Sequence, residues 1–317
     1  MKHQLSWSVF EGFDEIPGRG SLGRRLGALG VDGLELFTLF RPVEGRYRVP
    51  QVTSVHLPYA VDWVSAWEGR SYEGEPDDVR YFSFGRDRGE MVSNLCSAIR
   101  HAADVSPAYG VLHAGNADMR RVMERVHEGS DARVLGYFAE MMNRVASELG
   151  GEPPFRIAFE NLWWDGLKLR EPSEWRLLEG KLEFGNWGFA LDTGHLMNTC
   201  DRAVDEESAI DGVLRIVDRY PQDMRDRIGT VHLVLSTTAE ARRSFDCVPR
   251  GEGEPFSDFL RRVGERAASI DQHRPFSSPR AAEIVDAVRP DFVTHELYGR
   301  LSGDRFGDLR QQRALFP

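Results

Sequence analysis

The sequence has few cysteines and no long apolar runs. Its 317 residues include three cysteines (Cys96, Cys200 and Cys247), which are widely spaced and form no C-x-x-C pair. Sparse cysteines of this kind are typical of a reducing compartment and do not predict a disulfide framework. No run of 18 apolar residues occurs, so no membrane-spanning helix is predicted. The first residues also lack the apolar core of a signal peptide, and we therefore expect a cytoplasmic protein.

The sequence also lacks an excess of positive charge. It has 40 Lys and Arg against 50 Asp and Glu, which gives a net charge of -10. Non-specific DNA binding requires many phosphate-neutralising cations, so this balance argues against a nucleic-acid partner and favours a small-molecule substrate. No glycine-rich dinucleotide fingerprint or phosphate-binding loop follows the first predicted strand, which disfavours open nucleotide-binding sheets.

What the sequence does contain is a series of short apolar runs that alternate with helical patterns. Eight strands are predicted, at residues 5–10, 33–38, 52–59, 109–115, 155–162, 187–195, 228–236 and 292–297. Helices are predicted at residues 21–30, 87–104, 120–127, 133–149, 173–179, 206–220, 256–270, 279–288 and 304–315. Eight strand–helix units predict an α/β protein with a single (β/α)8 TIM barrel over residues 1–317. Its C-terminal helical extension would begin at about residue 300.

Six of the predicted strands carry a histidine or a carboxylate at or near their C-terminal ends. These residues are His56, His113, Glu160, Asp192, His232 and Glu296. Active sites of barrel enzymes are built at that end, and side chains two apart in a strand share a face. Each histidine alone would ordinarily be explained as a buried residue bonded to a carbonyl group. Together, the six predict a site for a divalent ion such as Zn²⁺ or Mn²⁺.

Several other residues have two interpretations each. Glu35 is either a general base or a barrel-core acid paired with an arginine such as Arg156, and we favour the structural role. His195 either binds metal or hydrogen-bonds a ligand. The remaining histidines (His3, His101, His127, His273 and His295) are expected to face solvent or helices and are assigned no chemistry.

The candidate substrate contacts are aromatic or basic. Trp163 and Trp164 either cover the barrel mouth or pack under a loop, and Trp63, within the long aromatic segment 59–85, either stacks on a flat substrate or packs within its own loop. Arg242 and Arg243 follow the seventh strand, where they either bind a phosphate group or belong to a solvated loop.

The order of these motifs resembles that of the xylose isomerase-like superfamily of TIM barrels, which includes sugar epimerases and endonuclease IV. The resemblance covers Leu5 to Leu297 and rests on short motifs in the expected order: a histidine after strand three, H-x-G, E-N, L-D-T-G-H, V-H-L and a final glutamate. It implies that Glu160, Asp192, His232 and Glu296 hold one metal ion. In the endonuclease-like branch, His56 and His113 would hold a second ion that shares Glu160.

The same resemblance points to a third metal set that the sequence does not complete at the expected place. His195 matches its first ligand, but the Asp-x-His pair expected before the turn at Gly251–Gly253 is missing. Asp246 is displaced by one position and Cys247 lies near the place of the histidine. We therefore expect two metal ions per chain.

The predicted function is metal-dependent hydrolysis of a small phosphodiester. Glu160 would bridge two ions, with Glu296 and His195 as further catalytic residues. The HLP and ENL signatures are similar to those of cobamide-remodelling phosphodiesterases, so a cobamide is one candidate substrate. The alternatives are a sugar isomerase or epimerase, in which Glu160 and Glu296 would shuttle a proton; an apurinic-site endonuclease; and a non-catalytic metal-dependent binding protein. Thr238 stands where epimerases place an arginine, which weighs against the first alternative.

Overall fold

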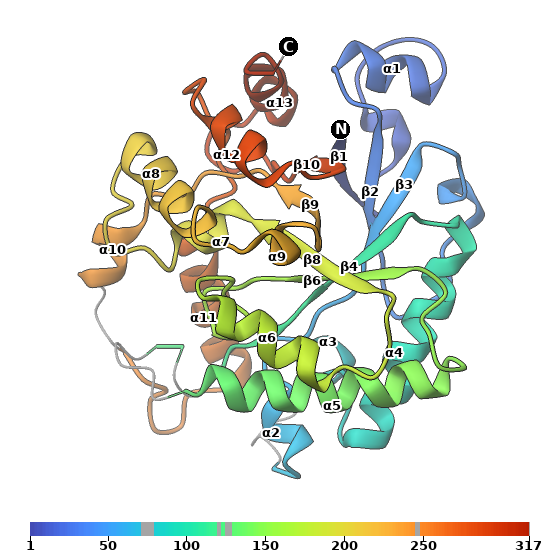
Figure 1. The fold of residues 1–317 in the computed structure, drawn as a ribbon, viewed down its shortest axis with the longest axis vertical. Helices are drawn as coiled ribbons and strands as arrows, with labels where there is room; N and C mark the ends of the chain where they lie inside the picture. The colour runs from blue at the N-terminus through green and yellow to red at the C-terminus, as the bar shows by residue number, and fades with distance from the viewer. Residues whose placement is uncertain (71–78, 119–121, 124–128, 245–247, 317) are drawn as a thin grey trace.

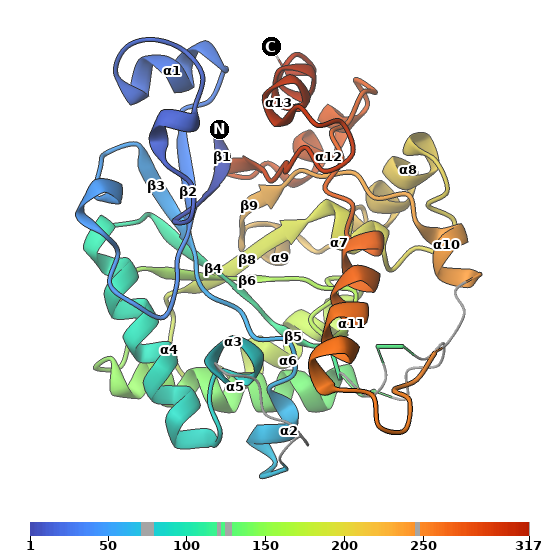
Figure 2. The ribbon, with the colours of Figure 1, turned by 180° about the vertical axis from the view of Figure 1, so that it is seen from behind.

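The architecture is a closed barrel of eight parallel strands surrounded by helices (Figures 1 and 2). It is taken from a computed structural model that describes residues 1–70, 79–118, 122–123, 129–244 and 248–316. Neighbouring strands follow the order β1-β10-β9-β8-β6-β4-β3-β2, and the first strand pairs with the last to close the barrel. The predicted (β/α)8 barrel is therefore confirmed.

The barrel strands are short, and six of them end at or next to a predicted ligand residue. They are β1 (Lys2–Ser8), β2 (Gly33–Phe37), β3 (Val52–His56), β4 (Tyr109–His113), β6 (Arg156–Glu160), β8 (Trp187–Asp192), β9 (Ile228–His232) and β10 (Phe292–His295). A separate antiparallel pair consists of β5 (Gly115–Asn116) and β7 (Asp165–Gly166).

The helices of the outer layer agree closely with the predicted amphipathic segments. They are α1 (Leu22–Ala28), α4 (Arg88–Ala102), α5 (Asp131–Glu148), α6 (Pro172–Lys181), α8 (Glu206–Val217), α11 (Phe256–Ile270), α12 (Ala281–Val288) and α13 (Arg305–Arg313). Short helices lie in the connections: α2 (Val64–Trp67), α3 (Val79–Ser83), α7 (Thr193–Met197), α9 (Gln222–Arg225), α10 (Ala239–Arg243), and three 3-10 turns at Phe13–Glu15, Gly45–Tyr47 and Ala103–Val105. The helix predicted at residues 120–127 falls mostly outside the described residues.

The barrel interior places a polar layer beneath the strand ends. The hydroxyl group of Tyr109 lies 2.7 Å from Gln4 Oε1, 2.9 Å from Glu35 Oε2 and 3.0 Å from Thr230 Oγ1. Because strand side chains alternate, the next inward position of each strand lies one layer closer to the C-terminal mouth. Thr230 is thus followed by His232 on the inner face of β9. A rigid, hydrogen-bonded floor therefore supports the site.

The long aromatic segment at residues 59–85 packs inward, which agrees with the second of the two interpretations given for Trp63. Its described part contains α2 and α3, and Trp63 and Trp67 are fully buried. Trp63 Nε1 donates a hydrogen bond to the carbonyl oxygen of Gly115 at 2.8 Å, so this ring holds the small β5–β7 sheet against the barrel. Burying the apolar surface of the Trp63 ring stabilises the fold more than exposing it at the barrel mouth would.

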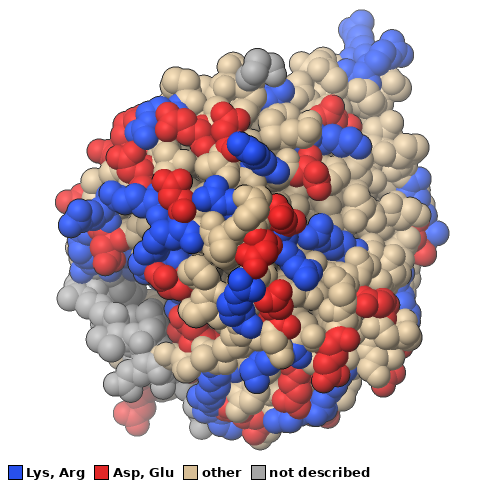
Figure 3. Space-filling view, viewed as in Figure 1, with Lys and Arg blue, Asp and Glu red and all other residues tan. Residues whose placement is uncertain are grey.

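The surface in Figure 3 mixes charges of both signs, with Lys and Arg interspersed among Asp and Glu. No helix of the described residues has the length and apolar content needed to cross a bilayer.

Candidate active site

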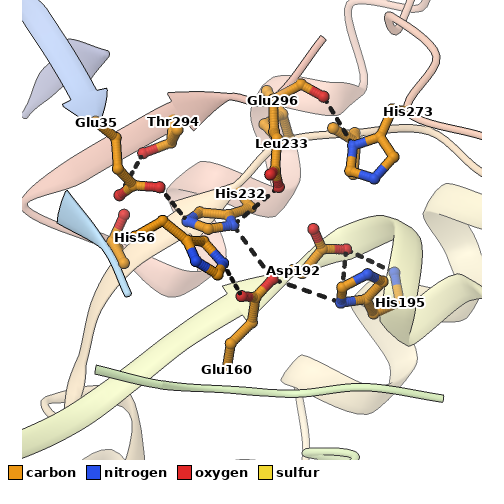
Figure 4. Close-up of polar contacts among 12 residues, drawn as sticks. Glu35, His56, Glu160, Asp192, His195, His232, Leu233, His273, Thr294 and Glu296 are labelled. Carbon is orange, nitrogen blue, oxygen red and sulfur yellow. Dashed lines mark hydrogen bonds and ion pairs between the residues drawn. The ribbon is translucent and has the colours of Figure 1, made fainter. Parts of the chain in front are cut away.

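Two groups of metal-type ligands meet at the C-terminal mouth of the barrel and share one carboxylate (Figure 4). The first group is His56, His113 and Glu160, and the second is Glu160, Asp192, His232 and Glu296. Within each group the potential ligand atoms lie within 4.8 Å of one another. All six residues predicted from the strand ends are thus brought together, because parallel strands end at the same rim.

Hydrogen bonds and ion pairs orient the histidine rings toward the centre of the site. The Nδ1–H group of His56 donates to the carbonyl oxygen of Leu57 at 2.8 Å, which leaves Nε2 facing Glu160 Oε2 at 3.1 Å. His232 is turned the other way, with Nε2 3.0 Å from Glu35 Oε1 and Nδ1 3.2 Å from Glu160 Oε1 and Glu296 Oε2. A second contact of this kind fixes the tautomer of a metal-binding imidazole.

The L-D-T-G-H segment joins the end of β8 to α7. Its contacts give a structural reason for the aspartate, the threonine and the glycine. Asp192 Oδ1 caps α7 by accepting from the His195 amide at 2.6 Å, and its Oδ2 has no hydrogen-bond partner. Thr193 Oγ1 accepts from the Val234 amide at 2.9 Å, which ties the end of β8 to the chain after β9. A Cβ at Gly194 would lie 2.9 Å from Val234 Cγ2, so glycine permits α7 to pack closely there.

A third group consists of His195, Asp271 and His273. The Asp-x-His pair stands immediately after α11, whereas the sequence predicted it before that helix. The structure therefore brings a third set of potential ligands together, built from a pair other than the one sought before the turn at Gly251–Gly253. His273 is buried with 8% of its surface exposed, whereas it was expected to lack a chemical role. The signal was present in the sequence as Asp271-Gln272-His273, but it follows a helix and not a strand. Cys247 lies outside the described residues.

The third group is oriented in the same way as the first. The Nδ1–H group of His195 donates to the carbonyl oxygen of Asn161 at 2.8 Å, and that of His273 donates to the carbonyl oxygen of Glu296 at 2.8 Å. Both Nε2 atoms face Asp271, at 3.6 Å from Oδ1 and 2.7 Å from Oδ2, respectively. Asn161 and Glu296 thereby connect this group to the second one.

The pKa values of the central groups reflect burial opposed by neighbouring charge. Burial raises the pKa of Glu160, but the charges of His232 and His113 outweigh it and hold that pKa well below its usual range. Burial lowers the pKa of His232, yet the charges of Glu35 and Glu160 raise it well above normal. Burial prevails at Asp192 and raises its pKa to about 7. Protons on imidazole rings thus balance the carboxylate charges at neutral pH.

The third group has the same electrostatic character. Burial raises the pKa of Asp271, but His273 and His195 lower it far below its usual range. Burial lowers the pKa of His273, and the charge of Asp271 then raises it to about 9. Burial lowers the pKa of His195, and the charges of Asp192 and Asp271 raise it well above normal, so a metal ion would displace protons from both imidazoles.

Glu35 contacts a histidine and not the arginine suggested by the sequence. Its Oε2 lies 2.9 Å from the hydroxyl of Tyr109, 3.2 Å from that of Ser54 and 3.3 Å from that of Thr294, while Oε1 faces His232. Arg156 instead donates to the carbonyl oxygen of Arg227 at the opposite end of the barrel. Glu35 therefore orients His232, which is a candidate metal ligand.

A cavity of about 210 Å³ opens over the ligands and includes Tyr298 and Arg300 in its wall. The hydroxyl of Tyr298 donates to Glu296 Oε1 at 2.6 Å. Sequence reasoning missed both residues because they lie in the loop after the last strand, where no periodic pattern applies. Among the described residues that line this cavity, Arg300 is the only lysine or arginine.

The predicted substrate contacts separate into two sets. Trp163 and Trp164 line a cavity beside the ligands, and the ring of Trp163 lies 5.0 Å from that of His195. Arg242 and Arg243 do not line either mouth cavity: they donate to the carbonyl oxygens of Cys200 and Asp201. These two arginines and the buried Trp63 therefore have structural roles, because each donates to a backbone carbonyl oxygen.

The donor set fits divalent metal ions. Among the described residues, several buried atoms that could bind metal have no hydrogen-bond partner although charged groups lie nearby: Glu160 Oε1, Asp192 Oδ2, Asp271 Oδ1 and His232 Nδ1. Leaving such atoms unsatisfied is costly, and a shared cation satisfies carboxylate and imidazole lone pairs together. Mixed nitrogen and oxygen donors without thiolates suit Zn²⁺ or Mn²⁺.

The fold and these clusters define a TIM barrel with a histidine- and carboxylate-rich mouth. The family model described as "Xylose isomerase-like TIM barrel" matches residues 81–293, well over half of the chain. The chain belongs to this family, and the resemblance noted from the motifs is confirmed. Its known members are enzymes, and they use divalent metal ions. A search of proteins with curated functions found no significant match.

Several solved structures share the fold. Endonuclease IV from Thermus thermophilus is 17% identical with a TM-score of 0.50, and the alignment covers 99% of this chain and 98% of that one. A D-tagatose 3-epimerase-like protein is 13% identical with a TM-score of 0.50, over 99% and 95% of the chains. The 3-keto-D-glucoside 4-epimerase YcjR from E. coli is 15% identical with a TM-score of 0.50, over 99% and 98%. At these identities the similarity establishes the shared fold.

Proposed function

We propose that the protein hydrolyses a small phosphoester at a centre of three divalent metal ions. The observation that carries this proposal is the sharing of Glu160 between two ligand groups, with a third group next to them. His56, His113 and Glu160 would hold one ion, Glu160, Asp192, His232 and Glu296 the second, and His195, Asp271 and His273 the third. When bound, such ions act as Lewis acids that activate water and stabilise charge on the phosphoryl group and leaving oxygen.

The protein's own side chains would position the reactants. Glu35 and Asn161 hold the imidazoles of His232 and His195 in the orientation needed for ligation. Tyr298 holds the carboxylate of Glu296, and the Arg300 guanidinium would neutralise a phosphate oxygen at the rim. In the overall reaction the oxygen of water forms a bond to phosphorus, the ester P–O bond breaks, and the ester oxygen leaves with a proton.

A sugar isomerase or epimerase would require less than this site contains. Such an enzyme needs one ion and two carboxylates to move a proton between carbon atoms, which the second group alone supplies. The first and third groups would then lack a role. Thr238, at the place of the epimerase arginine, is buried and donates to Asn198 Oδ1 at 2.8 Å. A phosphoester hydrolase therefore accounts for more of the buried polar residues.

A small substrate is favoured over DNA. Proteins that bind DNA neutralise several phosphates with lysine and arginine. Among the described residues that line the two mouth cavities, Arg300 is the only such cation. The net charge of -10 supports the same conclusion. A cobamide remains one candidate phosphodiester.

The first test combines metal content with hydrolysis of bis(4-nitrophenyl) phosphate. We expect three metal equivalents by elemental analysis and turnover by the zinc- or manganese-loaded protein. His56→Ala should lower hydrolysis by at least about 100-fold, because it removes a ligand. His101→Ala, on the outer helix α4, is the matched control and should change neither quantity. A single metal equivalent with ketose epimerisation that survives His56→Ala would overturn the proposal in favour of an isomerase.

A further inference from the structure

A second cavity of about 340 Å³ continues from the ligand cavity and differs from it in chemistry. The two cavities have these wall residues in common: Tyr59, His113, His195, Asp271 and Arg300. Any molecule that places one group among the ligands can therefore extend directly into the second cavity. Its volume lies at the small end of the range for ligand sites, which suits a group of one or two rings.

Beyond the shared residues, the wall of the second cavity is largely apolar. Helix α11 contributes Leu260, Val263, Gly264, Ala267 and Ala268, and the facing side contributes Ala60, Val61, Ala117, Val122 and Leu162. None of these side chains can donate or accept a hydrogen bond. A sugar hydroxyl placed against these side chains would lose its hydrogen bonds to water without replacement, which is unfavourable. Outside these side chains and the shared residues, the wall includes the Nε1–H group of Trp163, a buried donor without a hydrogen-bond partner among the described residues. The wall thus selects for an apolar group.

Aromatic rings border the junction of the two cavities. Tyr59 stacks on His113 with ring centroids 4.5 Å apart and an angle of 15° between the planes. Trp163 lies against His195, with Trp164 5.1 Å beyond it. Aromatic faces bind flat ring systems by stacking and by excluding water. The group next to the reaction centre is therefore best suited by a planar ring.

Arg300 stands where the two chemistries meet. It lines both cavities, it is exposed, and its guanidinium group lies 5.0 Å from the ring of Tyr298. A cation at this boundary matches a ligand whose anionic group enters the ligand cavity and whose ring enters the apolar one.

We propose that the substrate is a phosphoester of a flat, apolar group of one or two rings, seated between α11 and Trp163. This inference rests on the proposed function for the phosphoester part. The ring preference is a separate property of the apolar cavity and can be measured by binding alone.

The experiment is calorimetric titration of the zinc-loaded protein with stable phosphonates. The probes are 1-naphthylmethylphosphonate, methylphosphonate, and the methylene phosphonate analogue of ribose 5-phosphate, which carries sugar hydroxyls and no ester bond to cleave. We expect the naphthyl compound to bind about 30-fold more tightly than methylphosphonate, because its ring leaves water for the apolar cavity. Equal affinities for the naphthyl and methyl compounds, or tightest binding of the sugar phosphonate, would overturn the ring proposal.

A matched pair of variants on α11 localises the effect. Ala267→Phe fills the cavity and should remove most of the naphthyl preference while leaving methylphosphonate affinity unchanged. Ser269→Phe adds the same side chain at an exposed position outside the cavity wall and should bind both probes as the parent does. An unchanged preference in Ala267→Phe would contradict the proposed location.

The outcomes separate this inference from the proposed function. If the zinc-loaded protein hydrolyses phosphoesters but shows no naphthyl preference, the ring proposal fails and the hydrolase stands. If the preference is present and depends on position 267, but no aryl phosphoester is hydrolysed, the hydrolase fails and the ring site stands.

Discussion

Replacing Glu35 by glutamine should weaken one metal site without disturbing the barrel floor. Glu35 Oε1 lies 3.0 Å from His232 Nε2, and Oε2 is near three hydroxyl groups. In the variant, the amide oxygen can keep the hydroxyl contacts, but the NH2 group then faces His232. The ring must either present Nε2–H to another donor or move its proton to Nδ1, which removes the lone pair that would bind metal.

The size of this effect can be estimated because Glu35 contacts a candidate metal ligand, His232, and does not itself face the metal site. Loss of such a supporting contact typically costs 10–100-fold in metal affinity, or about 1.4–2.7 kcal/mol. Competition with a fluorescent zinc chelator should show this loss at one site only. Tyr109→Phe is the control, since it removes one hydroxyl from Oε2 and leaves the His232 contact. Unchanged zinc affinity in a folded Glu35→Gln protein would refute the argument that Glu35 fixes the His232 tautomer.

Three further predictions concern protons and metal content. Loading the metal-free protein with zinc at pH 7 should release protons, because the raised pKa values of His232, His195 and His273 keep their rings protonated. Calorimetric titrations in buffers of different ionisation enthalpy should detect this release. A binding heat that does not depend on the buffer would contradict it. His273→Ala should lose one metal equivalent by elemental analysis, and His101→Ala should lose none. Burial, and then the charge of Arg313, lowers the pKa of His3 from 6.5 to about 4. His3 therefore contributes stability that is present above pH 6.5 and declines as pH falls toward 4, by about 3 kcal/mol; if the free energy of unfolding of His3→Gln falls equally over this interval, His3 is not the cause.

The strand ends are the part of the site that local sequence could predict. An apolar run that ends in His56, Glu160 or Asp192 defines both an element and the rim where its last side chain lies. Alternation along a strand also separated Thr294 and Glu296, which face inward, from His295, which contacts α13 through Gln312. These predictions depended on a period of two residues and on parallel strands ending together.

Residues in the connections required the tertiary structure. Asp271 and His273 reach the site because α11 packs beside α7, where Asn198 donates to the carbonyl oxygen of Ile270 (Figure 2). Arg242 and Arg243 follow β9 in the sequence, and the strand ends at the mouth. Their guanidinium groups nevertheless donate to backbone carbonyl oxygens.

The sequence by itself determined the barrel and the six candidate ligands at its strand ends, because strand periodicity and the parallel topology fix which way those side chains face. Only the tertiary structure decided the third group of candidate ligands, the partner of Glu35 and the apolar cavity beside these residues. Those features depend on how loops and helices pack over the barrel mouth, and loop positions are set by long-range contacts that no local period encodes.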